Sequence, residues 1–362
     1  MDLSVAVAPL YVAAMATEDR VLRRRAAKQP GRVPVGYERS DTRTSLLMGA
    51  GSLTVPVWRY LGSQFVPKRG RFGNLLVIAA AGTVVGTTVA DRWRDRAGPR
   101  AERAGRIASV GGVASVVSGA LIATSGSAYL SAAARQWSKR RRDLGTGPLA
   151  WAAALVGWDL VYYWNHRLMH EVRAMWAIHV VHHSSERYNL STALRQPVAS
   201  AFGVWVPYGG LARLGVRPTL IELSRSINLI YQFWIHTEAV GRLAAAEAVL
   251  NTPSHHRVHH GSNPAYLDRN HAGILILWDR WFGTFQAEEP AEPVVYGLTR
   301  NIHTDSPWTV ATHEYRAMFA DVARARTWRD RLGFVLRSPG WAHRRRAQLD
   351  DAPALRAQGV AA

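Results

Sequence analysis

The segment DLVYYWNHRLMHEVRAMWAIHVVHH, residues 159–183, joins the end of an apolar stretch to closely spaced histidines. It contains HRLMH at residues 166–170 and HVVHH at residues 179–183, and the related HRVHH follows at residues 256–260. Positions i, i+3 and i+4 of an α-helix share one face. Each motif therefore predicts a helix that presents two or three imidazoles to one point.

Histidines are concentrated around these motifs, since 11 of the 14 in the chain fall between residues 166 and 271. Neutral imidazole is a nitrogen ligand for iron, copper, zinc and nickel. The motifs hold more histidines than one octahedral ion accepts, so two metal ions are predicted. His236, four positions after Gln232, is expected to join them. The predicted ligands are His166, His170, His179, His182, His183, His236, His256, His259 and His260.

Some histidines fit this pattern less well. His255 competes with His256, because His255 also lies four positions before His259, but His256 alone completes HxxHH. The histidines outside any ligand spacing are expected at the surface or around the ligands, and they are His271, His303, His313 and His343.

Polar residues near the motifs are candidates for supporting the ligands, because metal-bound imidazoles usually donate their second N–H to a carboxylate, carbonyl or water. Asp159 lies seven positions before His166, two helical turns away on the same face. A carboxylate in an apolar helix is costly unless it is paired, and a salt bridge or helix cap is the alternative explanation. The other candidates are Glu186, Asn189, Arg195, Glu238 and Asp279.

Composition narrows the classes of protein. The chain has 362 residues and no cysteine, which excludes disulfide scaffolds, iron–sulfur clusters and cysteine nucleophiles. It carries 45 basic and 26 acidic residues, a net charge of +19. The basic runs flank apolar stretches as topogenic signals do, so no nucleic-acid partner is predicted.

Apolar stretches rich in small residues favour membrane helices, although a soluble bundle of small residues stays open. The stretches are residues 3–16, 45–60, 74–90, 107–134, 149–164, 199–214 and 219–235. Residues 107–134 run uncharged between two basic connectors, residues 92–106 and 135–142. Because arginine is retained on the cytoplasmic side, residues 107–134 are expected to form a hairpin that breaks near residues 124–127.

The histidine motifs match the pattern HxxxH, HxxHH, HxxHH of the fatty acid hydroxylase/sterol desaturase superfamily of integral membrane di-iron enzymes. Residues 150–287 resemble its alkylglycerol monooxygenase-like bacterial branch, through residues 159–197, YQFWIHTE at residues 231–238 and residues 251–285. His271 departs from that branch, which usually has tyrosine there.

The resemblance implies an all-α fold, an integral membrane helical bundle with a cytosolic, histidine-rich helical cap. Residues 1–147 would supply membrane-anchoring helices, residues 148–290 the catalytic domain and residues 291–362 a polar basic tail. In that family two iron ions activate dioxygen to insert one oxygen atom into a C–H bond or to remove two hydrogens. The nine histidines named above would be their ligands.

The expected function is therefore hydroxylation of a lipid, sterol or other hydrophobic substrate by a membrane-bound di-iron oxygenase. Electrons would come from a separate ferredoxin, cytochrome or reductase, because the sequence has neither a nucleotide-binding fingerprint nor a haem-attachment motif. Desaturation and a non-catalytic metal-binding or metal-transporting membrane protein stay open. A multi-pass membrane protein is expected, with residues 20–32, residues 135–142 and the histidine motifs on the cytoplasmic side.

Overall fold

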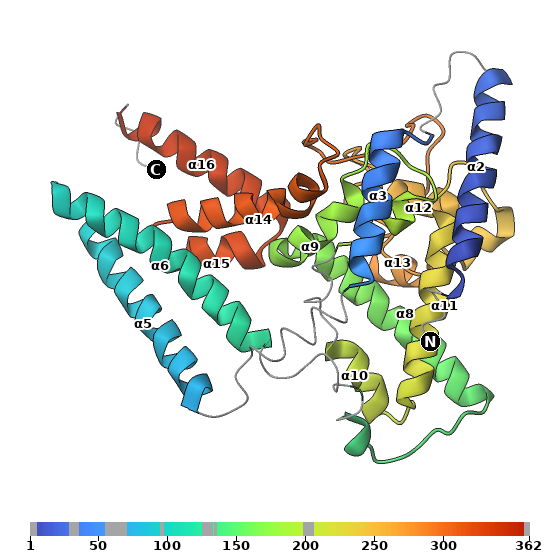
Figure 1. Ribbon diagram of the computed structural model, residues 1–362, viewed down its shortest axis with the longest axis horizontal. Coiled ribbons are helices and arrows are strands. Elements are labelled where there is room, and N and C mark those ends of the chain that lie inside the picture. The colour runs from blue at the N-terminus through green and yellow to red at the C-terminus, as the bar shows by residue number, and fades with distance from the viewer. Residues whose placement is uncertain are drawn as a thin grey trace. The chain divides into compact units, whose positions relative to one another are not determined.

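The computed structural model describes residues 6–28, 36–54, 71–94, 98–124, 133, 136–197 and 206–357, which form an all-helical protein (Figure 1). These residues contain no β-strand, only the isolated bridges Leu250–Leu275 and Gly261–Tyr296. The prediction of an all-α fold is confirmed. The helices are α2 (Ala8–Lys28), α3 (Arg39–Ser52), α5 (Arg71–Arg94), α6 (Pro99–Thr124), α8 (Pro148–Glu171), α9 (Arg173–His183), α10 (Val206–Arg213), α11 (Pro218–Ile235), α12 (Pro253–His259), α13 (Leu277–Phe282), α14 (Pro307–Arg324), α15 (Trp328–Leu336) and α16 (Pro339–Ala357), with short 3-10 turns η1 (Thr192–Leu194) and η3 (Ala244–Ala248).

The chain divides into two compact units, each built from several segments. Unit 1 comprises Met1–Trp58, Ala128–Leu168 and Ile178–Ala311, and unit 2 comprises Arg59–Ser127, Met169–Ala177 and Thr312–Ala362.

In unit 1, small residues let α8 approach its neighbours closely. Ala150 and Ala154 of α8 form one buried cluster with residues of α10 and α11, which include Leu211 and Leu220. Within this cluster Trp158 stacks on Tyr208 with ring centroids 4.9 Å apart. The first turns of α8 and α11 are thereby packed together, and each of these helices leads to a histidine at its far end.

In unit 2, α5 and α6 pair along their length (Figure 1). The Oγ of Ser115 donates to the Oγ1 of Thr83 at 3.0 Å, and a Cβ on Gly111 would lie 2.2 Å from the Oγ1 of Thr87. Glycine at residue 111 therefore permits the close approach of the two helices. Arg331 of α15 is fully buried and forms an ion pair with Asp91 of α5 at 2.5 Å.

Two expectations about the N-terminal region need correction. The apolar stretch at residues 3–16 and most of the basic segment at residues 20–32 were expected to be separate, but both belong to α2, because this helix continues to Lys28. The expected connector at residues 92–106 is largely helical, since α5 ends at Arg94 and α6 begins at Pro99. Arginine and alanine are good helix formers, and proline is favoured at the first helical position.

The described first half of the hairpin expected within residues 107–134 belongs to α6, which packs against α5. The predicted break lies largely outside the described residues, which end in this region at Thr124. Among the helices that are described, none is both long enough and apolar enough to cross a membrane.

Candidate metal centre

Four helices deliver imidazoles to the same region. His166 and His170 lie in the last turns of α8, and the motif at residues 179–183 ends α9. His236 directly follows the last residue of α11. The remaining motif, residues 256–260, forms the last part of α12 and its C-cap. This helix begins with Pro253, and proline is favoured at the first helical position.

All nine histidines fall into two groups, each able to hold a metal ion, with the candidate ligand atoms of a group within 4.8 Å of one another. The first group is His166, His170, His179, His183 and His259. The second group is His182, His236, His256 and His260. The groups adjoin each other, since the rings of His183 and His260 stack with centroids 4.4 Å apart.

The Nε2 atoms inside each group converge. In the first group the Nε2 of His179 lies 2.8 Å from that of His166 and 3.1 Å from that of His183. In the second group the Nε2 of His236 lies 3.1 Å from that of His182 and 3.0 Å from that of His256. Two nitrogens that bind one ion at about 2.1 Å and at a right angle lie about 3 Å apart.

Backbone carbonyls fix which nitrogen of three rings carries the proton. The Nδ1 of His166 donates to the His271 carbonyl at 2.8 Å, and that of His236 to the Gln232 carbonyl at 2.7 Å. The Nδ1 of His259 donates to the Arg269 carbonyl at 2.8 Å. In the neutral ring the Nε2 atom then holds a lone pair, as a metal ligand requires.

Burial keeps the imidazoles neutral. It lowers the pKa of His166 and of His236 to about 4, because a charged ring would lose its hydration. It also lowers the pKa of His256 and His260 well below the ordinary value, with neighbouring imidazoles adding to the effect. The buried Nε2 of His260 has no hydrogen-bond partner within the described part of the chain. Neutral rings whose lone pairs face one another fit a pair of cations.

Asp279 supports His166 indirectly, through the backbone segment whose carbonyl binds the His166 ring. Its carboxylate accepts from the backbone N–H of His271 at 2.7 Å, from that of Ala272 at 2.8 Å and from the hydroxyl of Thr284 at 2.6 Å. Burial raises the pKa of Asp279 to about 6, and these hydrogen bonds oppose the increase. Because the His271 carbonyl accepts from His166, Asp279 acts on the first group through one peptide.

Asp159 forms its hydrogen bonds with groups other than the imidazoles. Its two oxygens accept from the backbone N–H groups of Ile274 and Leu275, the indole of Trp278 and the side-chain amide of Asn228. Asn228 in turn accepts from Gln232, whose backbone carbonyl holds His236. Asp159 therefore ties α8 to α11 and to residues 274–278.

The other residues expected around the ligands have different partners. Arg195 is fully buried and binds the Val181 carbonyl of α9 and the Asp41 carboxylate of α3, at 3.2 and 3.1 Å. Asn189 accepts from the backbone and hydroxyl of Ser191. The two glutamates also have partners other than the predicted ligands. Glu238 accepts a hydrogen bond from the Tyr296 hydroxyl, and the Glu186 carboxylate lies 3.8 Å from the ring of His303.

The histidines left outside the ligand set lie in three kinds of surroundings. His255 is buried, with its Nε2 3.9 Å from Glu247. His271 is also fully buried, so it is not a surface residue, and its ring meets those of His166 and His259 edge-on. His303 and His343 are exposed, and His313 is partly buried.

Two supporting residues escaped the sequence analysis. Glu18 of α2 is buried and accepts from the Tyr37 hydroxyl at 2.5 Å, from the Leu190 N–H at 2.8 Å and from the Thr237 hydroxyl, next to His236. Its signal was the spacing of α2, where Met15, Glu18 and Leu22 share the buried face.

Tyr188 is the second such residue. Its ring packs against those of His236 and His260, with centroids 5.9 and 5.1 Å away, and its hydroxyl donates to the Ile235 carbonyl. No pattern in the sequence distinguishes it from other tyrosines.

Comparison with known proteins identifies the part of the chain that carries this centre. The fatty acid hydroxylase family matches residues 151–284. Alkylglycerol monooxygenase of Homo sapiens is 47% identical over 194 residues, 54% of this chain and 43% of that protein. Its Danio rerio counterpart is 49% identical over 191 residues, 53% of this chain and 42% of that protein.

More distant similarity extends to a bacterial enzyme. Ornithine lipid hydroxylase OlsE of Rhizobium tropici is 25% identical over 141 residues, 39% of this chain and 43% of that protein. The chain thus spans less than half the length of these relatives, and no solved structure matches it. Residues 151–284 thus match the fatty acid hydroxylase family and are similar to these enzymes, in agreement with the resemblance of the histidine motifs to the fatty acid hydroxylase/sterol desaturase superfamily.

Proposed function

We propose that the chain is a dioxygen-dependent di-iron monooxygenase that hydroxylates a C–H bond of a lipid. The observation that carries this proposal is the pair of adjoining groups of neutral, buried imidazoles, with nine nitrogen ligands and no carboxylate. Nitrogen ligands suit iron, zinc and copper, and of these it is iron that the family resemblance implies. Two bound iron ions would supply the activation of dioxygen.

The residues of the chain would have three tasks in this reaction. The nine imidazoles would hold the ions, and the carbonyls of His271, Gln232 and Arg269 would fix three of the rings. Burial of all nine rings keeps bulk water from the centre, which favours reaction with substrate over loss of the oxidant. Asp279 would hold the peptide behind His166.

We propose hydroxylation rather than desaturation because both kinds of relative are named for the insertion of oxygen. One is an alkylglycerol monooxygenase and the other an ornithine lipid hydroxylase. The reaction consumes dioxygen, two electrons and two protons, and yields one hydroxyl group and one water. The electrons would come from a separate ferredoxin, cytochrome or reductase. The substrate class to test first is an alkylglycerol, because the relatives with 47–49% identity are alkylglycerol monooxygenases.

We also propose that the enzyme works at a membrane, where a lipid substrate is available. Several apolar side chains of α5 and α6 are exposed, among them Ile78, Val85 and Val110. Residues 135–142 and the histidines were expected on the same side of the membrane, and this is possible only if α8 does not cross the bilayer. His166 lies 18 residues after Pro148 on α8, about 27 Å at 1.5 Å per residue, so α8 itself must then not cross the bilayer.

The decisive experiment uses full-length protein loaded with iron under anaerobic conditions, a chemical reductant, an alkylglycerol and ¹⁸O₂. Hydroxylation of the carbon beside the ether oxygen gives a hemiacetal, which breaks down to a fatty aldehyde and glycerol. Mass spectrometry should find one ¹⁸O atom in the aldehyde, provided that its exchange with water is prevented by immediate reduction to the alcohol. A product that has lost two hydrogens and gained no ¹⁸O would establish desaturation instead.

A further inference from the structure

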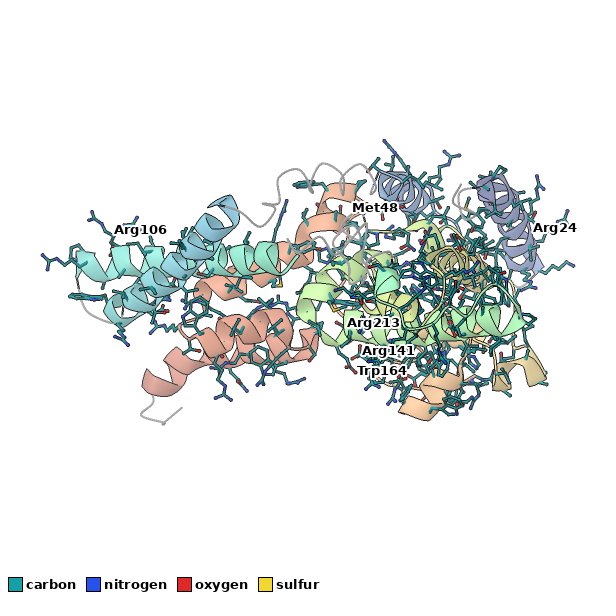
Figure 2. All side chains as sticks on the ribbon, turned by 90° about the horizontal axis from the view of Figure 1, so that it is seen from below. Arg24, Met48, Arg106, Arg141, Trp164 and Arg213 are labelled. Atoms are coloured by element: carbon teal, nitrogen blue, oxygen red, sulfur yellow. The ribbon has the colours of Figure 1, made fainter. Side chains whose placement is uncertain are left out.

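A cavity of about 520 Å³ lies beside the start of α8, lined by Arg141, Arg142, Arg213 and Leu214. Its volume is within the range of small-molecule sites, about 300–1,000 Å³. Figure 2 labels Arg141 and Arg213, two of the residues that line the cavity. The cavity is distinct from the candidate metal centre, because its lining shares no residue with either group of histidines.

The wall of this cavity is fixed by backbone contacts. Gly215 has a φ of +104°, and a Cβ there would lie 2.7 Å from the Arg142 carbonyl oxygen. The N–H of Leu144 donates to the Gly215 carbonyl at 3.0 Å, and Arg213 donates to the Lys139 carbonyl at 3.1 Å. Residues 139–144 are thereby held against residues 213–215, which places the three lining arginines around one space.

The positive charge of the cavity is not neutralised by neighbouring carboxylates. Asp143, the acidic residue next to Arg142 in the sequence, is engaged by Arg217 at 3.1 Å. Across the described residues, no carboxylate forms an ion pair with Arg141, Arg142 or Arg213. Three guanidinium groups around one space provide the planar, multiple donors that phosphate oxygens accept.

Apolar side chains accompany these arginines. Leu214 lines the cavity and is 62% exposed, and Leu149, at the start of α8, is 76% exposed. The guanidinium of Arg140 lies 3.9 Å from the ring centroid of Trp137. Basic side chains beside exposed leucines are typical of surfaces that contact lipid headgroups and the acyl chains beneath them.

We propose that this cavity binds the phosphate of an anionic phospholipid, with Arg141, Arg142 and Arg213 as its donors. A free phosphate ion shares the recognised chemistry, but it would gain nothing from Leu214 and Leu149. A nucleic acid would also be attracted by the charge. Its typical site adds exposed aromatic side chains that stack on bases, whereas the exposed apolar side chains here are leucines and Trp137 is partly buried against the cluster of α8, α10 and α11.

The test measures binding by calorimetry to the full chain held in an uncharged amphipol. The probes are dihexanoyl phosphatidylglycerol, dihexanoyl phosphatidylcholine, inorganic phosphate and a single-stranded oligonucleotide. One molecule of the anionic lipid should bind per chain, at least tenfold more tightly than inorganic phosphate or the zwitterionic lipid. Binding of inorganic phosphate or of the oligonucleotide with equal or higher affinity would overturn the proposal.

Three variants then locate the site. Replacing Arg141, Arg142 and Arg213 together by glutamine should weaken lipid binding about 100-fold, since each basic residue near a lipid surface contributes about fivefold. The matched control, glutamine at the exposed residues Arg20, Arg24 and Arg25, removes the same charge elsewhere in unit 1 and should leave the affinity unchanged.

A variant with lysine at the three lining positions keeps the charge and tests whether misfolding causes the loss. It should keep the unfolding temperature of the parent and bind the lipid more tightly than the glutamine variant, but more weakly than the parent, because lysine lacks the planar fork of donors. Equal losses in the lining and control glutamine variants, or no loss in the lining variant, would show that the cavity is not the site.

Discussion

His260 shows what the proposed second metal ion would do for a single side chain. Its ring is buried, its Nε2 atom has no hydrogen-bond partner in the described portion of the protein, and the nitrogens of three other imidazoles lie nearby. A buried polar atom of this kind destabilises the fold by about 1–3 kcal/mol unless something pairs with it. Within the proposal, the second metal ion is that partner.

Replacing His260 by alanine should therefore lower the metal content below two ions per chain. Activity should fall by more than the 10–100-fold that is typical when an outer partner of a ligand is removed. The matched control is His303→Ala, because His303 is 81% exposed and lies outside both groups. Metal analysis together with product formation measures both, and equal losses in the two variants would contradict the assignment of ligands.

Asp279 offers a second test at the scale of one residue. In the parent, the Asp279 carboxylate accepts hydrogen bonds from the backbone N–H groups of His271 and Ala272. In Asp279→Asn, an amide N–H₂ would face one of these N–H groups, and two donors cannot pair. The peptide behind His166 should shift, and metal affinity should fall about 10–100-fold. Competition with a metal chelator measures that affinity. Glu289→Gln changes an exposed carboxylate and should have no effect, so a parent-like Asp279→Asn would exclude the proposed support.

At the scale of elements, α3 is bound to the turn that follows the HVVHH helix. A Cβ on Gly49 would lie 2.7 Å from the backbone carbonyl oxygen of Leu194 in η1. The neighbouring Arg195 binds Asp41 of α3 and the Val181 carbonyl of α9. The helix that carries three predicted ligands is thus secured by a helix outside the residues that the family matches.

Gly49→Ala should destabilise the protein by about 1–3 kcal/mol, because backbone atoms cannot yield as a flexible side chain can. The comparison is Gly210→Ala in α10, where a Cβ meets nothing within 4 Å. That change should stabilise the protein by about 0.5–1 kcal/mol through helix propensity alone. Thermal unfolding measures both variants. Stabilisation by Gly49→Ala would mean that α3 does not approach η1 as closely as described.

At the scale of the whole molecule, the buried imidazoles link stability to pH. Burial lowers the folded-state pKa of His166 and His236 to about 4, below the 6.5 of an unfolded chain. The unfolded state consequently binds more protons between these values. The stability of the metal-free protein is fully present above pH 6.5 and is lost as the pH falls from 6.5 towards 4.

Metal-free protein should therefore have a lower unfolding temperature at pH 5 than at pH 7.5. Metal should raise that temperature at pH 7.5, because a ligand at 100 times its Kd stabilises the folded state by about 2.7 kcal/mol. It should raise it less at pH 5, since protons compete for the same nitrogens. Calorimetry with and without the metal tests this. A metal-free protein as stable at pH 5 as at pH 7.5 would show that burial does not lower the pKa of these rings in the folded state.

The sequence alone determined the class of site and the helical class of fold. The spacings HxxxH and HxxHH place imidazoles on one helical face whatever surrounds them, because helix geometry is local. The same spacing separated His256, which lies in the second group, from His255, which lies near Glu247. Apolar segments likewise indicated helices such as α8 and α11.

Only the tertiary structure decided how these helices divide their ligands and what holds them. The histidines of the HVVHH motif separate, with His182 in one group and His179 and His183 in the other. Glu18 reaches the turn beside His236 from α2, and Asp279 reaches His166 through the peptide of His271. The contacts of Glu18 with Thr237 and of His166 with His271 join residues more than 100 positions apart along the chain, and no local periodicity records them. They depend on which buried polar groups find partners when the helices pack.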